Sequence, residues 1–494
     1  MPDCRAALVI DIGTTNCKVS CYSCHDASVL ETRKFPTPVK SSEKGEVDFD
    51  IDALWQALRV IMAELISSTP FPIHNISIAS FGESGVFVDE ENTILTPMLA
   101  WYDRRGESYL SSLSKTEAEE IYSITGLPLH SNYSAFKMRW LLDNYSLHGR
   151  KDICWLHAPE VLLWRMTGEK KSEISMASRT LCLDITRRNW SRKAAGILGI
   201  PFNVLAPLIK PGEIAGWMTP ALRKELGCSY EVKVTLAGHD HMVGARALQM
   251  QPGEVLNSTG TTEGILLLNT QPTLNGQARK DKLANGCYSD GEFFTLFASL
   301  PVGGYALEWG KKTFRLTDKE INAALEMLLD HYLKPSWSIE QVPVFIPHLR
   351  GSGSPNKNRH SRGLLFGLTD TLAPESLLES LFIGLAMEFT HCYECFSLPA
   401  NTTVKVIGPA VKNPYWLQLK ADILQCPIEA IAFDETVSVG ALLIACPDIT
   451  PPPVPVAARY IPDALRSAKL KLFQQKWLAF YRFKLQQEGS ITNE

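Results

Sequence analysis

The tripeptide Gly-Thr-Thr occurs twice in this chain, at Gly13–Thr15 and again at Gly260–Thr262, each time after a short apolar run. In both places the pattern predicts a strand, a tight turn of small hydroxyl residues and a second strand. Glycine lets a ligand approach the backbone, and the N–H and hydroxyl groups of such a bend suit a phosphate. Two copies in separate halves therefore predict two similar lobes that grip one polyphosphate.

The order of the other elements predicts an α/β protein of two domains, which the length of 494 residues also favours. Strands expected at 6–12, 17–24, 28–36 and 73–80, with a helix at 51–67, indicate a mixed sheet covered by helices. Short strands are also expected at 87–89 and 94–101. The second lobe begins near residue 246 and repeats the opening, with strands at 254–258, 263–269 and 293–299 and helices at 320–332 and 374–396. We expect domains at 1–245 and 246–450.

Residues 451–494 are expected to form a proline-rich linker and a basic amphipathic tail helix. Such a helix is an element of packing or of an oligomer contact, which leaves a homodimer open.

Composition excludes several classes of partner. The net charge is −4 and 45% of the residues are hydrophobic, so no basic patch favours nucleic acid and no apolar run is long enough to span a membrane. The first residues lack the pattern of a signal peptide, and we expect a cytoplasmic protein. The scattered cysteines favour free thiols. The pairs Cys21–Cys24 and Cys392–Cys395 are expected to be plain thiol pairs, with a zinc site as the less favoured alternative.

Asp11 ends the first strand two residues before the first Gly-Thr-Thr turn. A carboxylate beside a phosphate-sized turn suits Mg²⁺, which keeps most of its waters and takes few protein ligands. We therefore expect Asp11 to hold Mg²⁺ through water, and the phosphates to contact both turns and Lys18 on the second strand. The alternative is an ordinary β-hairpin.

Asp240 follows the apolar run 234–237 and stands at the expected start of a helix. A helix N-terminus stabilises a carboxylate as an anion, and an ionised aspartate can accept the proton of an attacking alcohol. The alternative is that Asp240 only caps the helix. His239 and His241 lack cysteine or glutamate partners nearby, which favours hydrogen bonds to a substrate over zinc.

Three further segments have two interpretations each. Around Glu83, and from Trp101 to Arg105, aromatic, carboxylate and guanidinium groups suit a polyol, but Trp101 could be core and Asp103 part of a solvated turn. Residues 404–422 read as strand, turn and helix, in which small residues could contact a flat base. The polar, basic segment 350–363 is either a surface loop or a flap over an anionic substrate.

Taken in order, these segments resemble the FGGY carbohydrate kinases from about residue 6 to residue 446. Residues 81–85 and 237–240 are most similar to the fuculokinase branch. The resemblance implies two actin-like, ribonuclease-H-like domains that close on ATP, Mg²⁺ and a sugar, with the active site in the cleft between them. It also implies roles for individual residues: Asp240 as the base; Gly13, Thr14, Thr15, Lys18, Gly260, Thr261 and Thr262 at the phosphates; Gly408, Pro409, Ala410 and Asn413 at adenosine; and Glu83, Trp101, Asp103, Asn132, Tyr133, Asp240 and His241 near the sugar.

Two positions depart from the family pattern. Pro409 stands where the adenosine motif has glycine, and Ser352-Gly-Ser-Pro355 replaces the usual Glu-Arg-Thr-Pro, so the contacts of that loop are not carried over. The sequence predicts an ATP-dependent kinase that transfers the γ-phosphoryl group to a hydroxyl of a small ketose, polyol or related sugar. The alternatives are an actin- or chaperone-like ATPase with a conformational output and a non-catalytic sugar sensor on the same fold.

Overall fold

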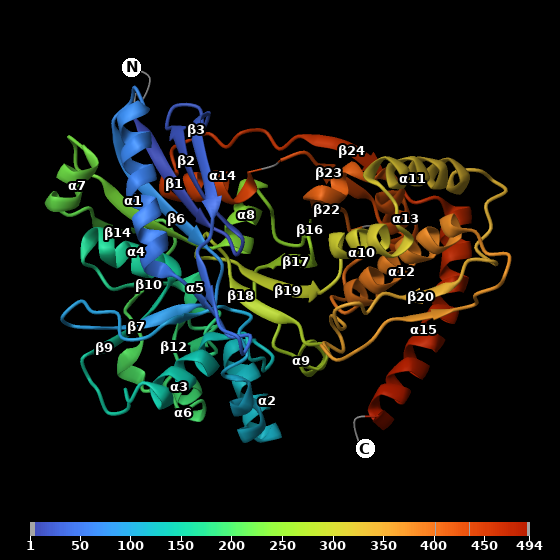
Figure 1. Cartoon of the computed structure of the whole chain (residues 1–494), viewed down its shortest axis with the longest axis horizontal. Coiled ribbons are helices and arrows are strands. Elements are labelled where there is room, and N and C mark those ends of the chain that lie inside the picture. The colour runs from blue at the N-terminus through green and yellow to red at the C-terminus, as the bar shows by residue number, and fades with distance from the viewer. Residues whose placement is uncertain (1–4, 401, 434, 492–494) are drawn as a thin grey trace.

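The computed structural model describes residues 5–400, 402–433 and 435–491, which form two lobes, each built on a mixed sheet (Figure 1). The N-terminal sheet has six strands, in the order β14 (Ile214–Trp217), β15 (Lys233–His239), β6 (Ile73–Ser80), β1 (Ala6–Ile12), β2 (Asn16–Ser23) and β3 (Val29–Pro36). β1 pairs with β2 antiparallel and with β6 parallel. The expected first strands and the α/β pattern are thus confirmed.

The C-terminal sheet repeats this order and adds one strand. It runs β18 (Ala284–Cys287), β19 (Phe294–Leu300), β17 (Glu263–Asn269), β16 (Val255–Thr259), β22 (Val404–Ile407), β23 (Ile428–Ile431) and β24 (Val456–Tyr460). β16 pairs with β17 antiparallel and with β22 parallel, as β1 does with β2 and β6. Each Gly-Thr-Thr turn therefore joins the two central strands of its own lobe.

Two helices cross between the lobes. α8 (Asp240–Ala247) follows β15, and α14 (Thr436–Ala445) follows β23 after a short loop. Although α14 comes from the second half of the chain, it packs on the N-terminal sheet, where Leu442 and Ile444 join Val9 in one core cluster. In Figure 1 it lies beside β1 and β6. α14 thus lies in the expected second domain, 246–450, by sequence and packs on the sheet of the first lobe.

The outer face of the N-terminal sheet is covered by α1 (Ile51–Ser68), α4 (Ala158–Thr167) and α7 (Pro220–Leu226). Smaller elements extend this lobe below the sheet. They are β4 (Val39–Ser41), β5 (Val47–Phe49), β7 (Gly85–Asp89), β8 (Met98–Leu99), β9 (Ile153–His157), β10 (Ser172–Glu173), β11 (Leu183–Asp184), β12 (Asn189–Trp190), β13 (Leu208–Ile209), α2 (Lys115–Thr125), α3 (Ser134–Asn144), α5 (Ile174–Ala177), α6 (Arg192–Ile197) and the 3₁₀ turns Glu107–Ser112 and Phe202–Val204.

The expected strand at 94–101 is wrong for most of its length. Only β8 is a strand there, and Ile94 makes a single bridge to Val88. Pro97 has no N–H to donate to a ladder. The Thr96 hydroxyl instead accepts the backbone N–H of Phe87 at 3.1 Å, so this segment turns instead of extending.

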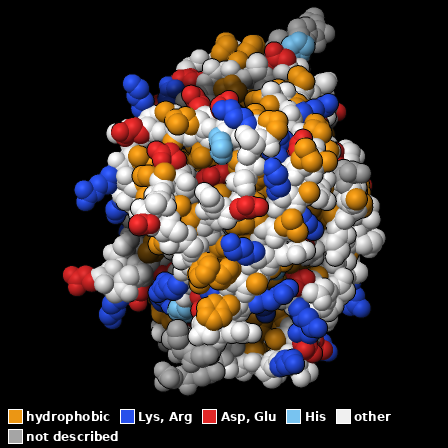
Figure 2. Space-filling view, turned by 90° about the vertical axis from the view of Figure 1, so that its right-hand side faces the viewer, with side chains coloured by type: hydrophobic (Ala, Val, Ile, Leu, Met, Phe, Trp, Pro, Cys, Tyr) orange, Lys and Arg blue, Asp and Glu red, His pale blue; other side chains and the backbone are white. Residues whose placement is uncertain are grey.

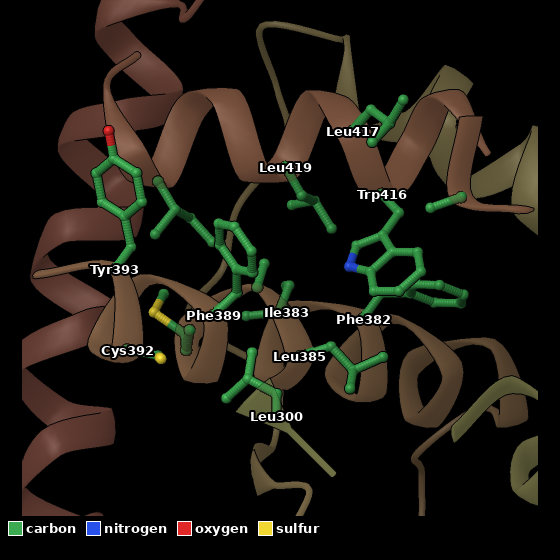
Figure 3. Packing of buried hydrophobic residues seen from close by; sticks show 14 of the residues in the cluster. Leu300, Phe382, Ile383, Leu385, Phe389, Cys392, Tyr393, Trp416, Leu417 and Leu419 are labelled. Atoms are coloured by element: carbon green, nitrogen blue, oxygen red, sulfur yellow. The ribbon is translucent and has the colours of Figure 1, made fainter. Parts of the chain in front are cut away.

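Helices α10 (Gly304–Phe314), α11 (Asp318–Tyr332), α12 (Pro374–Glu394) and α13 (Pro414–Leu424) build the largest core on the outer face of the C-terminal sheet; α9 (Gly276–Lys280), β20 (Val344–Ile346) and β21 (Leu364–Phe366) complete this lobe. Figure 3 shows the contact between α12 and α13, where Phe382 and Phe389 face Trp416 and Leu419. The rings of Phe382 and Trp416 meet edge to face, 5.8 Å apart between centroids.

The tail helix α15 (Ala464–Ile491) belongs to the same core. Leu470, Phe473, Trp477 and Tyr481 recur every three or four residues and are buried, and the Trp477 indole donates a hydrogen bond to the Phe345 carbonyl at 2.9 Å. Figure 2 shows the end of the C-terminal lobe, where Lys and Arg side chains are spread among apolar and acidic ones. Among the described residues, no helix is long and apolar enough to cross a bilayer.

Candidate functional site

A cavity of about 480 Å³ lies where the two sheets meet, and residues of both lobes line it. Its walls include eight residues that the sequence assigned to a site: Thr14, Glu83, Trp101, Asn132, Tyr133, Asp240, His241 and Thr262. The two Gly-Thr-Thr turns thus reach one space from opposite lobes.

The first turn is held by short contacts. The Gly13 N–H donates to the Asn16 carbonyl at 3.0 Å, and the Thr37 hydroxyl donates to the Gly13 carbonyl at 2.6 Å. The indole N–H of Trp101 donates to the Thr14 hydroxyl at 3.0 Å. Trp101 therefore forms part of the cavity wall and also positions the first turn.

The second turn is held by the start of α10. The Gly304 N–H donates to the Gly260 carbonyl at 2.7 Å, and the Tyr305 N–H donates to the Thr261 carbonyl at 3.1 Å. A Cβ atom on Gly304 would lie 2.6 Å from the Gly260 oxygen, so only glycine allows this approach. Sequence analysis missed this contact, although the adjacent glycines Gly303-Gly304 at the start of a helix were the available signal.

Asp240 is the first residue of α8, and the sharp bend before it aims it into the cavity. Gly238 has φ +109°, a backbone conformation suited to glycine, at the point where β15 shifts its register against β6. The His239 N–H donates to the Ser175 hydroxyl at 2.9 Å, which fixes the bend.

One carboxylate oxygen of Asp240 is engaged and the other is open. Oδ1 accepts the His241 N–H at 2.7 Å, and Nδ1 of the buried His239 lies 3.2 Å from it. Among the described residues, none donates a hydrogen bond to Oδ2. Asp240 does not cap α8, since its bond goes only to the next residue. Oδ2 is therefore free to accept a proton from a molecule in the cavity.

Burial raises the pKa of Asp240. The sequence predicted the opposite, because a helix N-terminus stabilises the ionised form. Burial and the nearby Asp240 charge together raise the pKa of Asp11 to about 7. The two carboxylates thus lie close enough to repel each other, with Asp240 in the cavity wall and Asp11 outside it, two residues before the first turn. A divalent cation would relieve this repulsion, so the donor set fits the expected Mg²⁺.

The residues expected to contact a polyol surround a buried ion pair that the sequence did not predict. Glu83 accepts a hydrogen bond from Nε of Arg179 at 3.0 Å, and the Arg179 guanidinium lies over the Tyr133 ring at 5.1 Å. Arg179 follows shortly after α5, and nothing local in the sequence marks its partner 96 positions away.

The structure does not bring Asp103 or Lys18 to the cavity wall. Both oxygens of the buried Asp103 are taken by Arg105 and by the Val47 N–H, which accounts for its lowered pKa despite burial. Asp103 therefore anchors a turn. Lys18 forms an ion pair at 2.5 Å with Glu435, which precedes α14, so it links β2 to the helix that covers the N-terminal sheet.

The expected adenosine segment lies outside the cavity wall, next to the second turn. The Thr259 hydroxyl donates to the Ile407 carbonyl at 2.6 Å and accepts the Ala410 N–H at 3.1 Å. Gly408 and Pro409 are exposed at the start of the 3₁₀ turn Pro409–Lys412, and the Asn413 side chain caps α13 by accepting the Trp416 N–H at 3.0 Å. The Asn413 carbonyl oxygen is thus already used within the protein.

A second carboxylate at the site is neutralised. Glu263, the first residue of β17, forms a buried ion pair with Lys420, whose ammonium also donates to the Asn257 side chain at 2.8 Å. Because its charge is balanced, Glu263 offers no site for a cation.

The loop 350–363 lines the cavity, so it is neither a free surface loop nor an unanchored flap. Asn356 donates to the Tyr481 hydroxyl at 2.9 Å, and Glu488 accepts the Ser361 hydroxyl at 2.9 Å, so α15 holds the loop. Arg359 forms an ion pair with Glu107 of the N-terminal lobe. In the described parts of the chain, no group of three His, Cys, Asp or Glu side chains could hold a metal ion, and this includes the CxxC pairs.

Comparison with known proteins agrees with this geometry. The model of the FGGY family of carbohydrate kinases, N-terminal domain, matches residues 6–246, and that of the C-terminal domain matches residues 255–447. A xylulose kinase of Bacillus subtilis (strain 168) is 25% identical over 448 residues, 88% of this chain and 87% of that protein. A gluconokinase of the same strain is 24% identical over 451 residues, 88% of this chain and 86% of that protein. The fold matches the crystal structure of a ligand-bound xylulose kinase from Lactobacillus acidophilus with a TM-score of 0.88, at 18% identity, over 99% of this chain and 100% of that one.

Proposed function

The chain belongs to the FGGY family of carbohydrate kinases and is an ATP-dependent sugar or polyol kinase, and we propose that Asp240 is the base of its phosphoryl transfer. The observation that carries this proposal is the free Oδ2 of Asp240, which faces a cavity lined by both Gly-Thr-Thr turns. An alcohol is a poor nucleophile, so a carboxylate that accepts its proton as the new bond forms lowers the barrier.

Each neighbouring group has a distinct role in this proposal. The His241 N–H and the buried ring of His239 hold Oδ1, so that Oδ2 points at the acceptor hydroxyl. Backbone and hydroxyl groups of the two turns bind the phosphates. Glu83, fixed by Arg179, and the face of Trp101 orient the sugar.

We propose that Asp11 holds Mg²⁺ through water. The support is its position beside the first turn and its close approach to Asp240, where burial and the second carboxylate disfavour its ionised form. When bound, Mg²⁺ would neutralise charge on the transferred phosphate. The phosphates on the second turn lie next to the segment 408–413, which we propose contacts the adenine base through backbone and small side chains.

Closure of the lobes around the cavity would keep water away from the γ-phosphoryl group. An actin- or chaperone-like ATPase would not need the cluster of Glu83, Arg179, Tyr133 and Trp101 in the cavity. We therefore place the acceptor hydroxyl between this cluster and Asp240.

The test is release of ADP from ATP in the presence of ketoses, polyols and sugar acids. Xylulose and gluconate are among the first acceptors to test, because two relatives are named xylulose kinase and gluconokinase. Asp240→Asn is expected to lower kcat about 10²–10⁴-fold while ATP binding is retained. The exposed Asp370→Asn serves as the matched control. Turnover by Asp240→Asn above about a tenth of the wild-type rate would remove Asp240 from this role.

A further inference from the structure

Positive charge lines one end of the cavity without a matching negative charge. Lys282, Arg350 and Lys357 all line it, and no described carboxylate forms an ion pair with any of them. Arg350 lies over the Tyr305 ring at 3.8 Å, but the ammonium groups of the two lysines have no such contact.

The other charges of the cavity are paired within the protein. Arg179 is bound to Glu83 at 3.0 Å, Arg359 to Glu107, and Glu263 to Lys420. Only Asp240 remains as an acid in the wall, and it is the proposed base. The protein therefore leaves a surplus of positive charge facing the space where the acceptor binds.

The two lysines lie at the sugar end of the cavity. Charges that act on Lys357 include those of Arg179, Glu83 and Lys282, and Lys357 in turn acts on His130. Glu83, His130 and Arg179 line the cavity together with Asn132 and Tyr133, where the residues suited to a sugar gather.

Lys357 is held in place at a conformational cost. Its φ of +47° and that of Lys282, +58°, lie in the left-handed region, as does that of Glu83, +67°. A non-glycine residue in this region costs conformational energy, which surrounding contacts must offset. The neighbouring Asn356 is tied to Tyr481 of α15, so the strained backbone is fixed. Burial, together with the Arg179 charge, lowers the pKa of Lys357 to about 8, as expected for an ammonium that lacks a counter-ion.

We propose that the acceptor is a polyhydroxylated acid whose carboxylate lies against Lys357 and Lys282 while one of its hydroxyls faces Asp240. This inference rests on the proposed kinase function and adds the substrate class to it. Two lysine ammonium groups suit a carboxylate, and a sugar with no charge would leave both without a counter-charge.

The experiment compares acceptors that differ only at one carbon. Gluconate is measured against glucitol, and xylonate against xylitol, each with ATP and Mg²⁺. We expect kcat/KM to be at least about 100-fold higher for the acid of each pair, since only the acid can pair with the two ammonium groups. A phosphorylated sugar of the same length forms the third arm, and a preference for it would overturn the carboxylate assignment.

Variants then locate the effect. Lys357→Met, and separately Lys282→Met, should reduce the ratio of acid to polyol at least about 10-fold, mainly through the KM of the acid, while Lys357→Arg keeps most of it. The exposed Lys280→Met, at the end of α9, removes a charge in the same segment outside the cavity and is the control. A rise in the KM of ATP in Lys357→Met, or equal use of acid and polyol by the wild type, would overturn the inference.

Failure of the kinase function itself is recognised separately. Thermal unfolding without ATP reports acceptor binding alone, because a ligand that binds the folded state raises Tm by mass action. A shift with gluconate and none with glucitol, lost in Lys357→Met, supports the acid site even if no acceptor is phosphorylated. No shift with either acid overturns the site whatever the turnover.

Discussion

The N-terminal and C-terminal sheets run in the same order around their central hairpins, yet Asp11 before the first turn stands where the second hairpin has Ser258. The helices that follow the equivalent strands β15 and β23 show the same difference. Both contain Val-Gly-Ala, at 243–245 in α8 and 439–441 in α14, but α8 begins with Asp240 and α14 with Thr436. The proposed base, Asp240, and the proposed metal-binding carboxylate, Asp11, therefore belong to one lobe.

This difference shows that two lobes with the same strand order can carry different functional side chains. Both hairpins offer the same turn to a phosphate, but the two carboxylates of the proposed transfer, Asp11 and Asp240, both belong to the first lobe. The acid of the second lobe, Glu263, is balanced by Lys420. We infer that the N-terminal lobe performs the transfer and that the C-terminal lobe mainly binds the nucleotide.

Exchanging the residue before the turn should give the largest effect. Asp11→Ser places the residue of the second hairpin in the first, and we expect kcat to fall about 10³-fold because the proposed metal contact is lost. The matched change, Ser258→Ala, should lower kcat less than about 10-fold. Steady-state rates at saturating ATP and acceptor measure both. Similar losses in the two variants would show that the lobes share the chemistry.

Breaking the balanced pair of the second lobe should affect stability. Lys420→Met leaves Glu263 buried and uncompensated, which is expected to cost about 4 kcal/mol. Adding Glu263→Gln to this variant should restore most of the loss, since no buried charge then remains. Urea unfolding followed by tryptophan fluorescence measures both. An unchanged midpoint in the single variant would mean that Glu263 is not a structural acid.

The crossing of α8 and α14 tests the two Val-Gly-Ala segments against each other. A Cβ atom on Gly440 would lie 1.9 Å from the Val243 carbonyl oxygen, so Gly440→Ala should cost about 3 kcal/mol. A Cβ atom on Gly244 would lie 3.3 Å from the Thr436 hydroxyl, and Gly244→Ala should stay within about 0.5 kcal/mol because alanine favours the helix. Equal unfolding midpoints would show that the crossing can spread at no cost.

The pH dependence of stability should carry the smallest difference. Burial and Asp240 raise the pKa of Asp11 to about 7, so folding takes up a proton between the ordinary value near 4 and about 7. Stability from this group is present at low pH and is lost as pH rises through this window. Between pH 5 and pH 7.5, the ligand-free Asp11→Asn should therefore gain about 2–3 kcal/mol relative to the wild type, since Asn does not titrate. Parallel curves for the two proteins, from urea unfolding at each pH, would contradict the shift; Ser258→Ala, in the equivalent position, should follow the wild type.

Sequence alone predicts the parts of the fold whose signals are local. The two hairpins, α1 and α12 follow from strand and helix periodicity together with turn residues, and the family of the chain follows from the order of its segments. The strand at 94–101 failed because the Thr96 hydroxyl and Pro97 replaced ladder bonds.

A site residue is predictable from sequence only where its own segment places it at the cavity and also provides the functional side chain. Asp240, Glu83 and Trp101 satisfy that condition and line the cavity, whereas Asp103 carries the same chemistry but is occupied by Arg105. Arg179 and Lys357 were not singled out, because their importance comes from partners and neighbours that only the folded chain brings together. The basic composition of 350–363 was the single hint of the latter.

The position of α14 also limits how the polypeptide can be divided. A fragment that ends near residue 250 would keep every strand of the first sheet but lose the helix that shields Ala7, Val9 and Ala79 on its inner face. The remaining fragment would in turn lack Met242 and Ala245, which cover Leu256 and Leu266. Neither half can therefore be expressed as an independently stable unit, and synthesis must nearly finish before the first sheet acquires its cover.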